Sequence, residues 1–211
     1  MSTQVRKQIE KENRRQVILD AAESIMRANG VHGLNVDLIA AETQLAKGTI
    51  YLYFKSKEEI LAELTLKSRN LLFQEFKQAT DTNESPIEKL KALVTANYRF
   101  SKSNPLFYDL VSLYEVNSQL VETAELQTAS NNITHLVMDI AEEARKNGSL
   151  NPNIDPLHFT MCMWGMTIGV HQLIKVRGKI FEEHFNVSEM DLINSFLQIL
   201  ENGIKSKILT E

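Results

Sequence analysis

Residues 35–57 read NVDLIAAETQLAKGTIYLYFKSK, and they indicate the fold more clearly than any other part of the chain. Its apolar residues recur at helical spacing in two short runs, Val36 to about Glu42 and Lys47 to Tyr53, which Thr43–Ala46 separates. Two helices this short are not stable on their own. They predict a helix-turn-helix that packs on a longer helix through its apolar side chains, Val36, Ile39, Ala40, Leu45 and Ile50.

The second short helix has the chemistry of a helix that contacts DNA. In a helix-turn-helix, the N-terminal end of the second helix enters the major groove and the first helix crosses the DNA backbone. Lys47 offers a cation to a phosphate, and Gly48 leaves no side chain in the way of a close approach. Hydroxyl groups of graded reach follow at Thr49, Tyr51 and Tyr53, and the main-chain amides at this helix start form an anion site.

One residue after this helix completes the pattern. Lys57 lies in the first turn of the following helix, where we expect it to hold a flanking phosphate. An alternative interpretation treats the aromatic residues as core and the lysines as solvated surface charges. We prefer the core interpretation for Phe54, whereas Lys47–Thr49 with Tyr51, taken as an ordered set, indicates DNA contact.

The region also resembles a known family. Residues 15–61 are similar to the DNA-binding domain of the TetR/AcrR family of bacterial transcriptional regulators, through Ala21-Ala22, Gly30, Val36, Ile39-Ala40, Lys47–Phe54 and Lys57–Leu61. The resemblance implies an all-α, TetR-like fold with a three-helix helix-turn-helix head and a six-helix body for ligand binding and dimerisation. It also implies a homodimer that binds a double-stranded DNA operator and a small-molecule effector.

Position by position, the resemblance gives roles to single residues. The residues implied to contact phosphates are Lys47, Thr49 and Tyr51, while Gly48 is implied to lie against the DNA backbone. Leu52 and Tyr53 are implied to lie near bases or near the sugar–phosphate backbone. Lys57 is implied to anchor the other edge. Gln44 and Ala46 belong to the same expected DNA-binding set but depart from the family pattern, which usually has glycine and a Ser or Thr cap there. A helix start without such a cap loses about 1 kcal/mol. Glutamine also tolerates left-handed backbone less well than glycine.

Beyond this region the chain reads as a series of helices. We expect residues 1–55 to be the helix-turn-helix DNA-binding domain and residues 56–211 the effector-binding and dimerisation domain, with about nine helices in all. The helix starts are marked by capping residues or prolines, at Asn35, Ser56 with Glu59, Ser85-Pro86, Asn104-Pro105, Asp155-Pro156 and Ser188 with Asp191. The helix from Pro156 is expected to reach about Arg177, and the last helix to end near Ile208.

Two features of the last helices indicate a dimer interface. The final helix carries an apolar stripe broader than one neighbour needs, made of Leu192, Ile193, Phe196, Leu197, Leu200 and Ile204. The helix before it holds Gly165 and Gly169, a spacing that lets another helix approach closely. Alternatively, these glycines only accommodate Trp164 or a core neighbour. A dimer would place two recognition helices about 34–36 Å apart, or a multiple of that, and would require a near-palindromic site.

An apolar set with a few polar groups is typical of an effector pocket. The expected effector-binding residues are Tyr98, Phe107, Tyr108, Met138, Phe159, Met163, Trp164 and His171. Trp164 is the first choice, because its large ring with one N–H donor can line a cavity and orient a ligand. The alternative is that these residues, at helical spacing, are plain core.

Composition excludes several other classes of protein. The chain has 211 residues, a formal net charge of −4 and a mean hydropathy of −0.21, which is typical of a soluble globular protein. Its one cysteine, Cys162, excludes an internal disulfide framework and is expected to be an inert buried thiol. The histidines lack metal-ligand spacing, so no metal, cofactor or enzyme activity is expected. The polar N-terminus lacks a secretory signal, and Leu157–Val176 reads as a buried helix rather than a membrane span.

An N-terminal arm precedes the helix-turn-helix and is rich in cations, Arg6, Lys7, Lys11, Arg14 and Arg15. In one interpretation the arm contacts DNA, either in a minor groove or along phosphates, because DNA grooves attract Arg and Lys. In the other, it is a solvated extension of the first helix.

Together these features predict a cytoplasmic, ligand-responsive transcriptional regulator. The preferred interpretation is a dimeric repressor that a small, largely apolar effector releases from a palindromic operator. The alternative is a DNA-binding protein without an effector, either structural or recruited by a partner. An all-helical enzyme with a vestigial head is a third class, but it would need clustered titratable groups that the sequence does not show.

Overall fold

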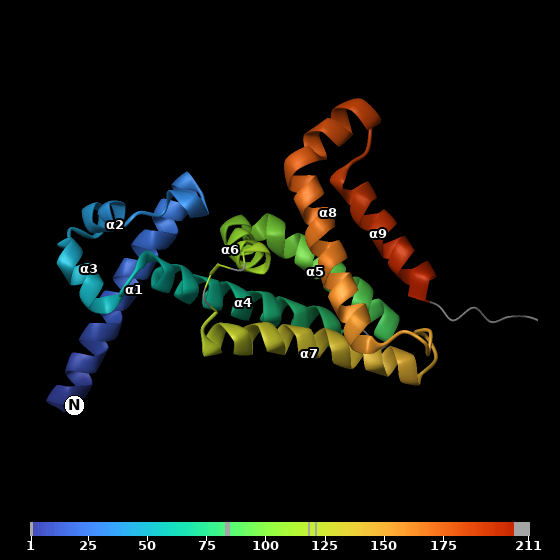
Figure 1. Ribbon diagram of the computed structural model, residues 1–211, viewed down its shortest axis with the longest axis horizontal. Coiled ribbons are helices and arrows are strands. Elements are labelled where there is room, and N and C mark those ends of the chain that lie inside the picture. The colour runs from blue at the N-terminus through green and yellow to red at the C-terminus, as the bar shows by residue number, and fades with distance from the viewer. Residues whose placement is uncertain (1, 83–84, 118, 121, 205–211) are drawn as a thin grey trace, which may run out of the picture. The chain divides into compact units, whose positions relative to one another are not determined.

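The computed structural model describes residues 2–82, 85–117, 119–120 and 122–204 (Figure 1). Within these ranges the chain forms nine α-helices and one short 3-10 helix, η1, and no strand. The prediction of an all-α fold is therefore confirmed. The elements are α1 Thr3–Asn29, η1 Val31–Gly33, α2 Val36–Thr43, α3 Lys47–Tyr53, α4 Lys57–Asp81, α5 Pro86–Ser103, α6 Pro105–Val116, α7 Ala124–Lys146, α8 Pro156–Phe185 and α9 Glu189–Ile204.

The helices group into two compact units. The described residues of 1–69 and 104–127 form one, here called the head unit, and those of 70–103 and 128–211 form the other, the body unit. The head unit contains α1 to α3 together with α6 and the first turns of α4. Because α4 follows α3 after only three residues and runs on into the body unit, it is the covalent link between the helix-turn-helix and the rest of the chain.

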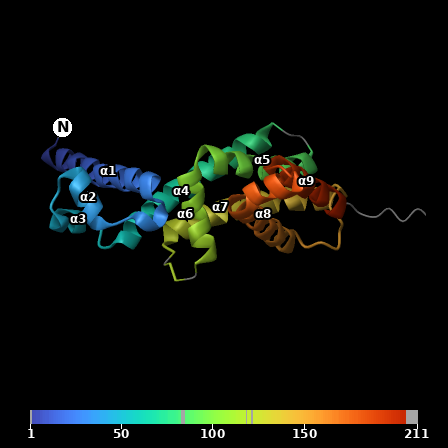
Figure 2. The ribbon, with the colours of Figure 1, turned by 90° about the horizontal axis from the view of Figure 1, so that it is seen from above.

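The helix-turn-helix is supported by one face of α1. Both views show α2 and α3 lying beside α1 (Figures 1 and 2). The buried side chains on this face of α1 recur every three or four residues and are Ile18, Ala21, Ala22, Ile25 and Met26. Ile39 of α2, Ile50 of α3 and Phe54 just after α3 are fully buried, as the sequence predicts. Val36, Ala40 and Leu45, from the same predicted set, are half-buried.

Local capping accounts for most helix starts. The side chains of Asn35 and Asp155 accept hydrogen bonds from the amides of Asp37, at 2.8 Å, and His158, at 3.0 Å. The Ser188 hydroxyl accepts a hydrogen bond from the Asp191 amide at 3.1 Å, and the Asp191 carboxylate accepts one from the Ser188 amide at 2.8 Å.

The end of α8 differs from the prediction, because the helix continues past Arg177 to Phe185. The charged residues near Arg177 do not end it; Asn186 does, by adopting a left-handed backbone with φ of 51°. The expected end of the last helix near Ile208 lies outside the described residues. No helix in the described part is both long enough and apolar enough to cross a membrane.

The body unit is built on contacts between α5, α8 and α9. Its core takes Leu90, Leu93 and Val94 from α5. The opposing buried residues of α9 are Ile193, Phe196 and Leu200. The buried face of α8 is more polar, since it includes Thr160, Thr167 and His171 beside Phe159 and Met163.

Candidate nucleic-acid interface

The recognition helix α3 begins without a side-chain cap. Ala46 holds the N-cap position with extended backbone, φ −64° and ψ 143°, and its side chain makes no capping hydrogen bond. Its carbonyl oxygen accepts from the amides of Thr49, at 2.8 Å, and Ile50, at 3.3 Å. The start of α3 is therefore held by main-chain bonds alone, as the alanine at this position predicts.

The turn before α3 depends on a strained glutamine. Gln44 has left-handed backbone, φ 56° and ψ 28°, where a glycine would adopt the same conformation freely. The amides of Gln44 and Leu45 both bond to the carbonyl oxygen of Ala40, the latter at 3.1 Å, and close the C-terminus of α2. For a side chain other than glycine this conformation costs about 1 kcal/mol.

Several expected DNA-contacting side chains are open to solvent. Leu52 is 81% exposed and Tyr51 50% exposed, so neither side chain is used up in packing α3 against the head unit. Gly48 is exposed, and a Cβ at this position would meet no atom within 4 Å. Thr49 and Tyr53 are half-buried.

The expected residues form one continuous region of the head unit. They lie in the turn after α2, in α3 and at the first residue of α4, and are Gln44, Ala46, Lys47, Gly48, Thr49, Tyr51, Leu52, Tyr53 and Lys57. Of these, Lys57 is half-buried. An exposed leucine beside an exposed tyrosine on a helix is suited to contact with thymine methyl groups and with phosphates.

Lys47 has an acidic partner that sequence reasoning missed. Its ammonium group forms an ion pair with the carboxylate of Asp37, in the first turn of α2. Both side chains are more than half exposed, so the pair adds little stability. A DNA phosphate at Lys47 would instead compete with this carboxylate.

Arg15, from the N-terminal arm, is a structural residue. Its Nη1 donates to the main-chain carbonyl of Tyr53, at 2.8 Å, and its Nη2 pairs with Glu63, at 2.5 Å. The guanidinium also lies 4.3 Å from the ring centroid of Phe54. One side chain of α1 thus fixes the end of α3 and the first part of α4.

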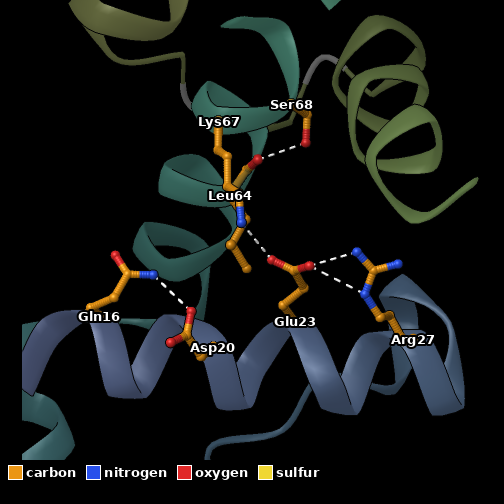
Figure 3. Close-up of polar contacts among 7 residues, drawn as sticks. All are labelled: Gln16, Asp20, Glu23, Arg27, Leu64, Lys67 and Ser68. Carbon is orange, nitrogen blue, oxygen red and sulfur yellow. Dashed lines mark hydrogen bonds and ion pairs between the residues drawn. The ribbon is translucent and has the colours of Figure 1, made fainter. Parts of the chain in front are cut away.

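A second polar contact joins α1 to α4, as Figure 3 shows. Glu23 accepts from Lys67 of α4 at 2.8 Å and from Nη2 of Arg27 at 2.6 Å. Partial burial raises the pKa of Glu23, but these two hydrogen bonds outweigh it and leave the pKa below its ordinary value. The carboxylate is therefore ionised at neutral pH and holds the two helices together.

Arg69 is the buried charge of the head unit, and nothing in the sequence marks it. Only 1% exposed, it donates to the Leu126 carbonyl oxygen at 2.9 Å. It also pairs with Glu122, at 2.6 Å, and Glu115, at 3.2 Å. This cluster ties α4 to the end of α6 and to the first turn of α7, and a buried arginine needs such partners to remain charged.

The expected effector-binding residues fall in both units. Phe107 and Tyr108 belong to α6 of the head unit, where the Nζ of Lys67 lies 5.0 Å from the ring centroid of buried Phe107. The others lie in the body unit and are Tyr98, Met138, Phe159, Met163, Trp164 and His171. Phe159 and Met163 are buried, whereas Trp164 and Met138 are half-buried.

The body unit brings Tyr98 and His171 together in a polar cluster. Their rings meet edge to face, with centroids 6.0 Å apart. The Tyr98 hydroxyl donates to Glu189 at 2.8 Å, and Lys102 pairs with the same carboxylate. Burial lowers the pKa of His171 to about 4, with the Lys102 charge acting in the same direction and Glu189 opposing it. Sequence reasoning found the two rings but missed Lys102 and Glu189.

The expected dimer stripe is divided between an inner and an outer face. Ile193, Phe196 and Leu200 are buried inside the body unit, while Leu192 and Leu197 are half-buried, because α9 turns this stripe toward its own neighbours. The side chain of Ile204 lies outside the described part of the chain.

The exposed apolar surface lies mainly on α8. Its large apolar side chains include Met161, Leu173, Val176 and Ile180, which share a face with Gly165 and Gly169 at spacings of three and four residues. Both glycines are exposed, with no atom within 4 Å of an added Cβ. Cys162, expected to be buried, is exposed beside this face.

In the head unit, a short exposed helix that begins with a lysine packs with α1 and α2. This arrangement defines a helix-turn-helix DNA-binding regulator. Residues 18–64 match the model of bacterial regulatory proteins of the tetR family, and the predicted resemblance to this family is confirmed. The predicted TetR-like fold and the predicted role in DNA-binding transcription regulation are thereby confirmed.

Two curated relatives and one solved structure illustrate the likeness. The transcriptional repressor KstR2 of Mycolicibacterium smegmatis is 27% identical over 147 residues, covering 68% of this chain and 70% of that protein. The fatty acid metabolism regulator protein of Bacillus subtilis is 23% identical over 193 residues, covering 90% and 95%. The crystal structure of the regulator FadR from Bacillus subtilis, in complex with stearoyl-CoA, superposes with a TM-score of 0.71 at 22% identity, covering 90% and 98%.

Proposed function

We propose that the chain is a homodimeric repressor that a small, largely apolar effector releases from a near-palindromic operator. The observation that carries this proposal is the exposed side of α3, where Leu52 and Tyr51 extend into solvent from a helix whose opposite side is buried at Ile50. Arg15 fixes the end of this helix, so that its outer side chains are preorganised for a groove.

The dimer is supported by the apolar outer face of α8. Soluble monomers rarely expose a large contiguous apolar patch, and this face carries Met161, Leu173, Val176 and Ile180. Gly165 and Gly169 lie on the same face, so a second helix can approach the α8 backbone closely. A symmetric partner would use the same face, which makes the interface self-complementary.

The effector class is supported by both the body unit and a solved relative. Phe159 and Met163 are apolar, and they lie on the same buried face of α8 as His171. The Oδ1 atom of buried Asn97 on α5 has no hydrogen-bond partner within the described structure and could accept one from a ligand. Because FadR from Bacillus subtilis was crystallised with stearoyl-CoA, we propose that the apolar part of the effector is an acyl chain, which the charged coenzyme A carries as a thioester.

Release requires only that the effector bind the DNA-free state better than the DNA-bound state. A hundredfold preference corresponds to about 2.7 kcal/mol of coupling, which lies in the range of ordinary allosteric proteins. The covalent route for this coupling is α4, which Glu23 and Arg69 hold within the head unit.

Titration of a protein–operator complex with acyl-CoA esters of increasing chain length tests the proposal. We expect long-chain esters to raise the Kd for operator DNA at least tenfold, while free coenzyme A has no effect. Operator binding that no ester changes would support the alternative, a DNA-binding protein that acts without this effector. A protein that turns over the ester would instead point to an enzyme.

A further inference from the structure

The first turns of α1 are not needed to support the helix-turn-helix. Residues 3–14 are exposed throughout, and the first buried residue of α1 is Ile18. Arg15 bonds to Tyr53, the last residue of α3, so the turns before Arg15 continue past that end of the recognition helix (Figure 1). Twelve helical residues extend the helix by roughly 18 Å.

These turns carry a stripe of cations on one side. Lys7, Lys11 and Arg14 are spaced by four and three residues, and four further residues lead to Ile18. Positions with this spacing share one face of a helix. Ile18 belongs to the face of α1 that is buried in the head unit, so the three cations lie on the side of α1 that holds α2 and α3. The apolar residues Val5 and Ile9 lie on the opposite side.

The three cations are not used within the chain. No residue of the described structure forms a hydrogen bond or ion pair with the side chain of Lys7, Lys11 or Arg14. Cations further along the head unit differ, since Arg15 and Lys67 both pair with carboxylates. The side chains of the stripe therefore remain available to a partner near the end of α3 that Arg15 holds, where their charge adds to that of a DNA-binding surface.

We propose that Lys7, Lys11 and Arg14 form a second DNA-binding surface, which holds the sugar–phosphate backbone next to the site contacted by α3. This inference rests on the proposed function, because it needs an operator. The partner follows from charge complementarity: Lys7 to Arg14 span roughly 10 Å of helix, which matches neighbouring phosphates over about a third of a turn of DNA. Contacts of this kind position a protein and raise its affinity without reading bases.

The test compares two triple variants of the full chain. The stripe variant carries Lys7→Gln, Lys11→Gln and Arg14→Gln, and the matched control carries Lys77→Gln, Arg99→Gln and Lys146→Gln. Both lose three exposed cations from helices, and glutamine keeps the helix propensity close to that of lysine and arginine. The readout is the operator Kd over a series of salt concentrations, with circular dichroism as a check that both variants remain folded.

We expect the stripe variant to bind operator DNA at least tenfold more weakly at low salt, and the control to stay within about threefold of wild type. Each lost phosphate contact should reduce the slope of log K against log salt by about 0.9, so the slope of the stripe variant should fall by about 2.7 for each protomer. An unchanged slope with wild-type affinity would overturn the inference. If the wild-type chain fails to select any operator, the proposed function fails instead.

Footprinting gives an independent readout of the same contact. Hydroxyl radicals cleave the sugar–phosphate backbone wherever protein does not cover it. Wild-type protein should protect backbone positions outside the half-site that the stripe variant leaves open to cleavage. Identical footprints for the two proteins, at saturating concentration, would contradict the contact.

Discussion

The guanidinium of Arg15 donates a hydrogen bond to the main-chain carbonyl oxygen of Tyr53, with 2.8 Å between Nη1 and the oxygen. This carbonyl belongs to the last residue of α3 and has no intrahelical donor available. A cation at the C-terminus of a helix also interacts favourably with the helix dipole. The recognition helix, which lacks a side-chain cap at its start, is therefore fixed by α1 at its end.

Replacing Arg15 by methionine should weaken both the head unit and DNA binding. The change Arg15→Met keeps an aliphatic stem over Phe54 but removes the hydrogen bonds to Tyr53 and Glu63. We expect the free energy of unfolding to fall by about 1–2 kcal/mol, measured by urea titration. The control Arg6→Met changes an exposed arginine on the same helix, outside the basic stripe, and should have no such effect. Equal midpoints for the two variants would contradict the structural role of Arg15.

Supplying a cap for α3 should stabilise the protein. In Ala46→Ser, the hydroxyl can accept from the free amides of the first turn, which should raise the free energy of unfolding by about 1 kcal/mol. The control Ala41→Ser places the same side chain on an exposed position inside α2, where serine is a slightly poorer helix former than alanine. Denaturant midpoints that move the same way in both variants would argue against an uncapped start.

Replacing Leu52 by alanine should weaken DNA binding without lowering the stability of the fold. Because the side chain is 81% exposed, Leu52→Ala should change the free energy of unfolding by less than about 0.5 kcal/mol. Its burial against a base should nevertheless be lost, which weakens operator binding by about 1 kcal/mol or more. Val116, 71% exposed on α6, supplies the control Val116→Ala. Anisotropy titrations in which both variants bind like wild type would remove Leu52 from the interface.

The dimer face on α8 can be tested at its glycines. A Cβ added at Gly169 meets no described atom within 4 Å, so we expect the Gly169→Leu protomer to stay folded, but the larger side chain should hold a partner helix away. We expect monomers by sedimentation and a large loss of operator affinity. Gly203→Leu adds the same bulk to an open helical position of α9 and should remain dimeric. A dimeric Gly169→Leu protein would place the interface elsewhere.

Stability should fall at mildly acidic pH because of His171. Its pKa of about 4 lies below the 6.5 of an ordinary histidine, so between these pH values the unfolded chain binds a proton that the folded chain does not. The free energy of unfolding therefore decreases as the pH drops from 6.5 toward 4, by up to about 3 kcal/mol, and this contribution is constant above that window.

The variant His171→Gln should lose this part of the pH dependence. Its free energy of unfolding should change less between pH 7.5 and pH 5 than that of wild type, whereas exposed His135→Gln should follow wild type. Equal slopes for His171→Gln and wild type would show that the buried imidazole does not cause the decrease.

Local rules predict the helix-turn-helix well, and contacts between distant residues explain what they miss. Asn35 and Ser188 mark helix starts because a cap bonds to amides within three residues of itself. Arg69 could not be recognised, since its partners Glu115 and Glu122 lie 46 and 53 residues away.

In the last two helices, the apolar periodicity does not show which partner covers each apolar face. The α9 stripe predicts an apolar face but not its neighbour, and Ile193 and Phe196 prove to be buried within the chain. The open face lies on α8, where exposed apolar residues share one face with Gly165 and Gly169. A hydrophobic pattern fixes which side of a helix is covered, but it does not distinguish a neighbour in the same chain from a second copy.

The central claim is that α3 selects a particular DNA sequence within a dimer. The most direct measurement is selection of genomic DNA fragments by the purified protein at two salt concentrations, with Leu52→Ala in parallel. We expect wild-type protein to recover a near-palindrome at both concentrations and the variant to recover it poorly at the higher one. Recovery of unrelated fragments, lost as salt rises, would mean that phosphate contacts alone hold the DNA and would contradict the claim.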